Sequence, residues 1–163
     1  MAIETRRRLF LTFGLCLVFV ILEALFAGGD ISAKIDSVKM PAYSPPLWGW
    51  FVIGALYYVV CFTVIYRLLK LDIQSGLRTA GMVLIILVMF INAAWNILFF
   101  QTTDFQIIYL AFLPYNLIAL ALLIILTRLD RIAALSFAPY MIYLLYANIW
   151  AYGVWRLNAV ISG

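Results

Sequence analysis

Two asparagines and one glutamate are the side chains best placed for chemistry, because they interrupt long apolar runs of a 163-residue chain. Asn92 and Asn96 are four residues apart, so on a helix both amides project from one face, with Trp95 beside them. Such amides either form a hydrogen bond to a neighbouring helix, which contributes about 1 kcal/mol or less to stability, or contact a ligand. A charge such as Glu23 inside an apolar run is costly unless it is paired, protonated or hydrated. Glu23 therefore either reaches the interface near Gly28 or lines a polar pocket or ion path.

The usual catalytic groups are missing from the sequence. There is no His, which removes the commonest general base and the usual axial ligand of haem. Cys16 and Cys61 lie in separate apolar runs and predict two buried thiols without a metal. Neither paired carboxylates nor a phosphate-binding glycine loop is evident. We therefore expect a protein that is not an enzyme and requires no cofactor or metal.

Aromatic side chains are more numerous than a belt at the membrane interface requires, with 17% of residues Phe, Trp or Tyr. Trp and Tyr near helix ends are ordinary interfacial anchors. Tyr143, Tyr146 and Trp150, however, fall toward the middle of the last apolar run. At that depth an inward-facing aromatic pocket competes with the anchoring interpretation.

Lipid-embedded helices must position these side chains. Apolar residues make up 67% of the chain and charged residues 11%, which a water-soluble domain could not sustain. About 20 apolar residues cross a hydrocarbon core of roughly 30 Å, and long runs without alternation exclude a β-barrel. The sequence predicts an all-α integral membrane protein, with residues 1–163 as a single domain. We expect a five-transmembrane-helix bundle, with helices at about residues 9–28, 46–69, 79–100, 105–126 and 132–155.

Residues 29–45 turn polar and predict an extramembrane loop that ends in Pro45-Pro46, where proline favours a helix start. Pro114 should bend the fourth helix, and Pro139 could kink the fifth. Cations are unequally divided: Lys34, Lys39 and Arg156 would share a face with this loop. The other eight would lie on the N-terminal side: Arg6, Arg7, Arg8, Arg67, Lys70, Arg78, Arg128 and Arg131. This asymmetry predicts the N-terminus inside and the C-terminus outside. The cations form no basic face, so we expect no nucleic-acid partner.

Three motifs appear in order along the chain. The first is Met-Pro-Ala-Tyr-Ser-Pro-Pro-Leu-Trp at residues 40–48, with Tyr58 on the helix that follows. The second is Asn-x-x-Trp-x-x-Leu-Phe-Phe at residues 92–100. The third begins at Pro139-Tyr140 and continues with Ala147, Tyr152, Val154, Trp155, Arg156 and Asn158. With five helices, these motifs resemble the translocator protein family, also called tryptophan-rich sensory proteins or peripheral-type benzodiazepine receptors.

The resemblance implies a homodimer of five-helix bundles, each with a ligand cavity capped by the loop at residues 29–45. A flat hydrophobic ligand, such as a porphyrin (a tetrapyrrole of the haem type) or a sterol, would suit aromatic walls. The predicted ligand-binding residues are Tyr43, Pro45, Pro46, Trp50, Tyr58, Asn92, Trp95, Phe99, Tyr140, Tyr143, Ala147 and Trp150. We hypothesise that Lys34 and Lys39 attract porphyrin carboxylates. Tyr152 and Arg156 retain part of the family's sterol-recognition pattern.

Some positions depart from the family. A loop Trp and a helix 5 Trp, which the family associates with photochemical porphyrin breakdown, read Lys34 and Tyr143 here, and a helix 2 Trp reads Gly54. We therefore do not expect that activity. The first functional hypothesis is a membrane binding protein, sensor or transporter for porphyrin-like or sterol-like ligands. The alternatives are a small proton-coupled transporter that uses Glu23 and a structural or assembly subunit without its own ligand.

Overall fold

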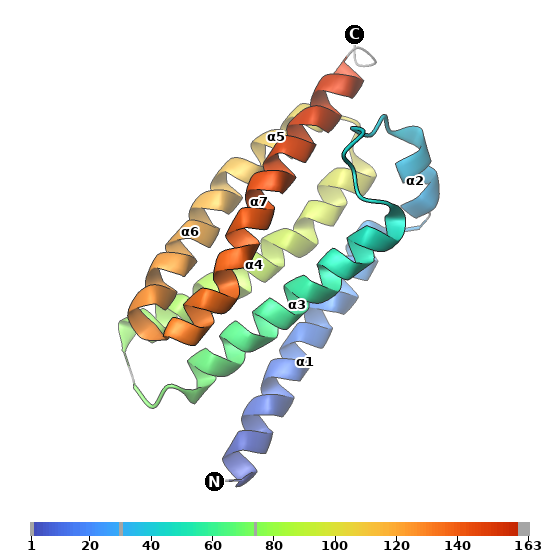
Figure 1. Ribbon diagram of the computed structural model, residues 1–163. Coiled ribbons are helices and arrows are strands. Elements are labelled where there is room, and N and C mark those ends of the chain that lie inside the picture. The colour runs from blue at the N-terminus through green and yellow to red at the C-terminus, as the bar shows by residue number, and fades with distance from the viewer. Residues whose placement is uncertain (1, 30, 74, 160–163) are drawn as a thin grey trace.

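The computed structural model describes residues 2–29, 31–73 and 75–159, and in these ranges the chain forms helices and no strands (Figure 1). The helices are α1 (Ala2–Ala27), α2 (Ile31–Ser37), α3 (Leu47–Lys70), α4 (Gly76–Gln101), α5 (Phe105–Leu110), α6 (Phe112–Leu129) and α7 (Arg131–Asn158). Five segments are long and apolar enough to cross a membrane: Ile3–Ala27, Leu47–Lys70, Gly76–Gln101, Phe105–Leu129 and Arg131–Asn158. The predicted all-α, five-transmembrane-helix bundle is therefore confirmed.

The five spans pack in a closed ring, in the order α1, α3, α7, α6 and α4, with α4 returning to α1. α3 also contacts α4 across the ring. The N-terminus projects from one end of the bundle, and α2 and the C-terminal part of α7 lie at the other (Figure 1). We call the latter the α2 end and the former the N-terminal end.

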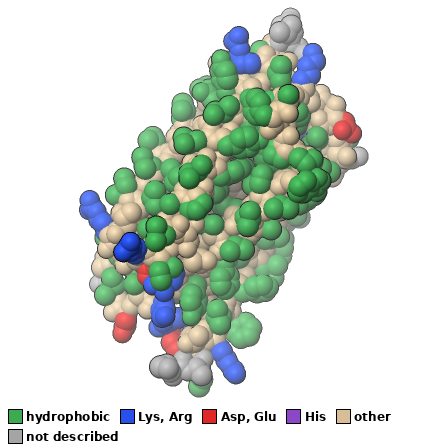
Figure 2. All heavy atoms as spheres, viewed as in Figure 1, with side chains coloured by type: hydrophobic (Ala, Val, Ile, Leu, Met, Phe, Trp, Pro, Cys, Tyr) green, Lys and Arg blue, Asp and Glu red, His purple; other side chains and the backbone are tan. Residues whose placement is uncertain are grey.

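The outer flank of the bundle is apolar. Ile142, Leu117 and Leu145 keep 71%, 68% and 68% of their surface exposed, which water would penalise and acyl chains would not. Figure 2 shows hydrophobic side chains covering the visible flank, while the coloured charged groups gather toward its two ends. This distribution is that of an integral membrane protein. Within the ring, Cys16 and Cys61 are free and buried, as predicted.

The helix ends extend beyond the predicted spans, because capping and ion pairs carry helices past the apolar runs. α1 begins at Ala2 instead of residue 9, and Arg8 Nε lies 3.2 Å from Glu4 Oε1 one turn away. α4 begins three residues early, after Ser75, whose hydroxyl accepts a hydrogen bond from Arg78 N at 3.2 Å. Hydropathy reports the membrane-embedded part of a helix, not its whole length.

The fourth span is two helices, because the chain turns at Ala111 between α5 and α6. Pro114 has no N–H to donate to the Leu110 carbonyl four residues back, and its ring crowds that carbonyl. The bend expected at Pro114 therefore takes the form of a break one turn earlier. α7 stays helical through Pro139.

The predicted loop at residues 29–45 contains a helix that the sequence pattern did not reveal, α2, whose seven residues are too few to show a periodic signal. Asp30 lies outside the described residues. The segment after α2 returns along α7. There Lys39 N donates to Asn158 Oδ1 at 3.1 Å, and Asn158 Nδ2 donates to the Lys39 carbonyl at 3.0 Å.

Three further hydrogen bonds hold this segment on α7. The Tyr43 hydroxyl donates to the Ile149 carbonyl, and the Tyr146 hydroxyl donates to the Tyr43 carbonyl, both at 3.1 Å. Trp150 Nε1 donates to Ser44 Oγ at 2.9 Å. The loop is thereby fixed over the α2 end of the ring, where it covers the interior.

Candidate ligand cavity

A cavity of about 960 Å³ lies inside the ring of helices, and every membrane span contributes to its wall. Three apolar side chains of α2 and the loop, Ile31, Ile35 and Met40, also line it. The volume falls near the top of the range of roughly 300–1,000 Å³ that is typical of small-molecule sites. The space exists because a ring of five helices has a wider centre than the side chains at this level fill.

Tryptophan and phenylalanine rings form one side of the cavity. Trp150, on α7, is the centre of this group, with its ring centroid 5.0 Å from Trp50, 5.7 Å from Phe99 and 6.2 Å from Trp95. Trp95 and Phe99 stack nearly in parallel, with centroids 5.1 Å apart and planes 11° from each other. These contacts hold rigid, flat surfaces against the open space, which favours ligands that are flat themselves.

Tyrosine rings form the adjoining part of the wall. Tyr57 contacts Tyr58 and Tyr140, with centroids 5.2 and 5.1 Å apart, and Tyr140 continues to Tyr143 at 5.7 Å. The hydroxyls of Tyr115 and Tyr140 are hydrogen-bonded to each other at 2.5 Å. The wall is thus aromatic with hydroxyls at its rim, a surface able to stack on a ring and to bond its polar edge.

Glu23 lies on the cavity wall and is bonded to helix α4. Its Oε1 accepts a hydrogen bond from Asn92 Nδ2 at 2.6 Å. Asn96, also on the wall, donates instead to carbonyls of its own helix, at 3.4 Å to Asn92 O and 3.3 Å to Ala93 O. Of the two open interpretations of Glu23, the structure favours the polar pocket over the interface. Asn92 combines an interhelical bond with a place in the cavity.

Three buried polar atoms of this wall have no hydrogen-bond partner within the described part of the chain: the hydroxyls of Tyr57 and Tyr58 and Trp95 Nε1. The Tyr58 hydroxyl faces the Glu23 carboxylate without reaching hydrogen-bond geometry. Buried donors without acceptors are rare and costly. Their concentration on one cavity is the arrangement expected of a site that a ligand completes.

The sequence profile of the TspO/MBR family matches residues 12–156, nearly the whole chain and all five spans. The chain belongs to this family. It is the translocator protein family that the three motifs indicated. Protein CrtK of Rhodobacter capsulatus is similar to the chain, with 27% identity over 135 residues that cover 83% of this chain and 82% of that protein.

Most of the predicted ligand-binding residues of this TspO/MBR protein line the cavity. Nine do so: Trp50, Tyr58, Asn92, Trp95, Phe99, Tyr140, Tyr143, Ala147 and Trp150. Tyr43, Pro45 and Pro46 do not. Tyr43 is bonded to α7, and the two prolines pack against Gly49, where a Cβ would lie 3.1 Å from Pro45 Cβ. These three shape the loop above the cavity without forming its wall.

The two lysines predicted to meet ligand carboxylates do not line the cavity either. Lys34 Nζ donates to the Thr102 carbonyl at 3.0 Å, at the end of α4, and lies 5.8 Å from the centroid of Phe105. The backbone of Lys39 is bonded to Asn158, and its side chain is exposed. Among the described residues that line the cavity, Glu23 is the one charged side chain.

The sterol-pattern residues Tyr152 and Arg156 also lie away from the cavity, and both are exposed. The Tyr152 ring meets Tyr109 and Trp155 on the outside of α7, with centroids 5.6 and 5.8 Å away. In this TspO/MBR chain, these two residues lie on the outer surface of α7 and not in the cavity wall.

Two tyrosines of the wall, Tyr57 and Tyr115, were not among the predicted ligand-binding residues. Tyr57 and Tyr115 lie deep in apolar runs of the sequence, and in the structure both line the cavity and are only 5% exposed. A tyrosine at that depth is itself a signal, because its hydroxyl needs a polar environment. Gly54 also lines the cavity, and a Cβ built there would meet nothing within 4 Å. Gly54, which stands where the family has a Trp, therefore leaves open space in the cavity.

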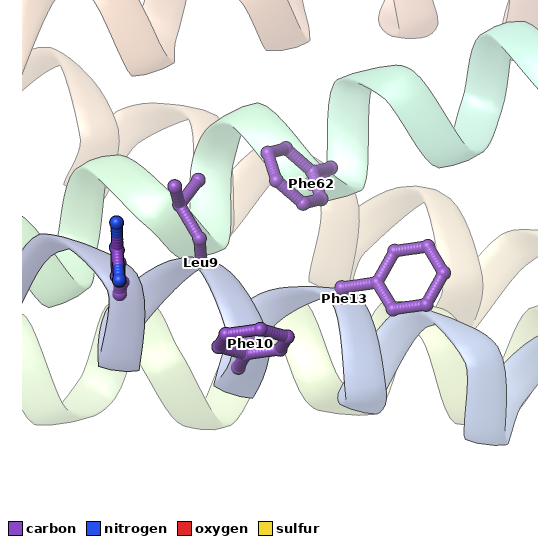
Figure 3. Close-up of a pocket in the computed structure, with 5 residues that line it drawn as sticks. Leu9, Phe10, Phe13 and Phe62 are labelled. Carbon is purple, nitrogen blue, oxygen red and sulfur yellow. The ribbon is translucent and has the colours of Figure 1, made fainter.

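A second hollow, of about 470 Å³, lies on the flank of the N-terminal end (Figure 3). Leu9 of α1 and Phe62 of α3 point toward each other between the two helices, and Phe10 and Phe13 lie along α1 (Figure 3). Arg6 completes the lining. Phe10 is 75% exposed and Phe13 60%, so this hollow opens on the flank and holds no enclosed site.

Proposed function

We propose that this TspO/MBR protein binds a flat, hydrophobic ligand of the porphyrin or sterol kind in the cavity, as a membrane sensor or transporter. The observation that carries the proposal is the cavity of about 960 Å³ walled by Trp50, Trp95, Trp150 and their neighbouring rings. Burial and stacking supply the affinity. The unpartnered hydroxyls and indole N–H orient the ligand by bonding its polar edge.

Orientation, assembly and chemistry are part of the same proposal. The N-terminal end lies on the inner side of the membrane, because eight of the eleven Lys and Arg residues belong to that end of the protein. The family resemblance supports a homodimer. The protein binds the ligand without converting it, since Lys34 and Tyr143 stand where the family's photochemically active members have Trp.

Quenching of tryptophan fluorescence by protoporphyrin IX, measured on purified protein in phosphatidylcholine nanodiscs, tests this function. We expect saturable quenching, because three of the five tryptophans line the cavity. Gly54→Leu should weaken binding at least about tenfold, since an isobutyl group in the open space clashes with a rigid ring. A sterol that uses the same cavity should compete with the porphyrin.

Gly14→Leu is the matched control. Gly14 also has nothing within 4 Å of its Cβ position, but it lies on α1 outside the cavity wall. It should leave porphyrin binding unchanged. If both leucine variants bound protoporphyrin as the wild type does, or if quenching never saturated, the cavity would not be the binding site.

A further inference from the structure

We propose that Glu23 forms a cation-recognising subsite, so that the cavity prefers flat aromatic ligands that place a protonated amine or other cationic nitrogen against its carboxylate. The proposal rests on the function proposed above and specifies the class of ligand. It also reverses the electrostatic expectation drawn from Lys34 and Lys39, which assigned recognition to ligand carboxylates.

The geometry of the carboxylate leaves room for such a partner. An ionised carboxylate accepts about four hydrogen bonds. Within the described residues, Glu23 receives one in good geometry, from Asn92 Nδ2 to Oε1. Its other oxygen receives no hydrogen bond of good geometry from the described residues, although the Tyr58 hydroxyl faces the same group, so it can accept from a molecule in the cavity.

Among the described residues that line the cavity, no cationic side chain accompanies Glu23. Lys34 and Lys39 belong to the segment above the cavity, but the Lys34 ammonium donates to the Thr102 carbonyl and neither lysine lines the cavity. A carboxylate in an apolar setting is costly unless it is paired, protonated or hydrated. A cationic ligand supplies the pairing charge, and the attraction is strong because the surroundings have a low dielectric constant.

The rest of the wall suits the same ligand. Electron-rich faces of Trp and Tyr attract cations, and Tyr58, Trp50 and Tyr143 all belong to the wall that contains Glu23. The body of an aromatic cation would stack on these rings, and its charged nitrogen would meet the carboxylate. A ligand carboxylate in the same place would be repelled by Glu23.

A set of three porphyrins that share one ring and differ only in charge provides the test. Protoporphyrin IX carries two carboxylates, its dimethyl ester is neutral, and its bis(2-aminoethyl) amide carries two ammonium groups. Binding is measured in zwitterionic phosphatidylcholine nanodiscs, so that surface charge of the lipid does not attract any probe. We expect the diammonium porphyrin to bind about tenfold more tightly than the ester, as befits one charge-assisted hydrogen bond.

Glu23→Gln should remove this preference, so that the variant binds the ester and the diammonium porphyrin with equal affinity. Glutamine is nearly isosteric and still accepts from Asn92, so the wall keeps its shape. Glu4→Gln makes the same change on the same helix, at an exposed site beside Arg8, and should retain the preference.

The possible results separate the two proposals. If wild-type protein bound all three porphyrins equally, or if Glu23→Gln kept the preference for the diammonium probe, the cation subsite would be overturned and the cavity function would stand. If no porphyrin bound the wild type, the proposed function would fall, and the subsite with it.

Discussion

At the α2 end of the bundle, aromatic rings surround an open cavity, whereas at the N-terminal end mainly aliphatic side chains fill the space between the same five helices. The filled end is built from side chains with 0–1% exposure: Val64, Ile65, Leu68, Ile85, Leu122, Leu126 and Phe137. Gly81 lets the helices approach, since a Cβ there would meet Ile125 Cγ2 at 3.3 Å and Leu68 Cδ1 at 3.6 Å. Branched chains interlock and close a ring, whereas stacked rigid rings hold it open.

The acidic side chains at the two ends also have different partners. At the N-terminal end, Asp130 Oδ2 lies 2.6 Å from Arg67 Nη2, and Asp130 caps α7 by accepting from Ala133 N at 2.8 Å. Burial acts to raise the pKa of the Asp130 carboxyl, but these hydrogen bonds and the Arg67 charge outweigh it and lower the pKa. In the described part of the chain, Glu23 at the cavity accepts its hydrogen bond from the Asn92 amide and not from a cation. The filled end is stabilised by close packing and an ion pair, whereas the hollow end leaves the space that the proposed function assigns to a ligand.

Removal of the Asp130 carboxylate is the strongest way to break the filled end. Asp130→Ala should cost about 2–3 kcal/mol of unfolding free energy, less than the ~3–5 of a fully buried pair, because Arg67 stays partly exposed. Porphyrin affinity of the folded protein should not change. Denaturant unfolding in detergent measures the unfolding free energy, and fluorescence quenching measures the porphyrin affinity. Asp36→Ala, at an exposed position on α2, should cost less than about 0.5 kcal/mol.

The same carboxylate gives this end a pH dependence. Because the folded pKa of Asp130 is below its unfolded value, its contribution to stability is complete above the unfolded value, about 3.9, and is lost as the pH falls through the folded pKa. Asp130→Asn should flatten this acid limb of the stability profile. An unchanged limb in the variant would assign acid sensitivity to other groups.

A matched pair of leucine truncations sharpens the comparison. Leu122 is fully buried on α6 at the filled end, and Leu144 is 2% exposed on α7 where it lines the cavity. Leu122→Ala should cost about 2 kcal/mol, because it opens a void in packed surroundings, whereas Leu144→Ala should cost less than about 1 kcal/mol because it only widens a space already present. Equal losses of unfolding free energy would show that both ends are packed alike.

Apolar runs and three motifs were enough to predict the five spans and nine cavity residues, because lipid dictates the helices and motif spacing dictates their faces. In a loop, no helical periodicity fixes the direction in which a side chain points. Tyr43 was therefore predicted to bind the ligand, whereas its hydroxyl donates to the Ile149 carbonyl on α7. For a related reason the sequence did not indicate that the Lys34 ammonium bonds to the carbonyl of Thr102, just beyond α4. Arg67 and Asp130 are 63 residues apart, and no local pattern joins them.

The smallest expected effect concerns the loop that covers the hollow end. A Cβ on Gly153 would overlap the Tyr43 hydroxyl and lie 2.8 Å from Pro41 Cγ, so Gly153→Ala should displace the loop and break the bond from Tyr43 to the Ile149 carbonyl. One neutral hydrogen bond is worth about 1 kcal/mol, which predicts roughly fivefold faster porphyrin dissociation. Stopped-flow displacement measures that rate. Gly14→Ala, in open space on α1, should leave the rate unchanged and add a few tenths of a kcal/mol of stability. If Gly153→Ala released porphyrin no faster than Gly14→Ala, the loop would not retain the ligand, and the hollow end would be open to it by another route between the helices.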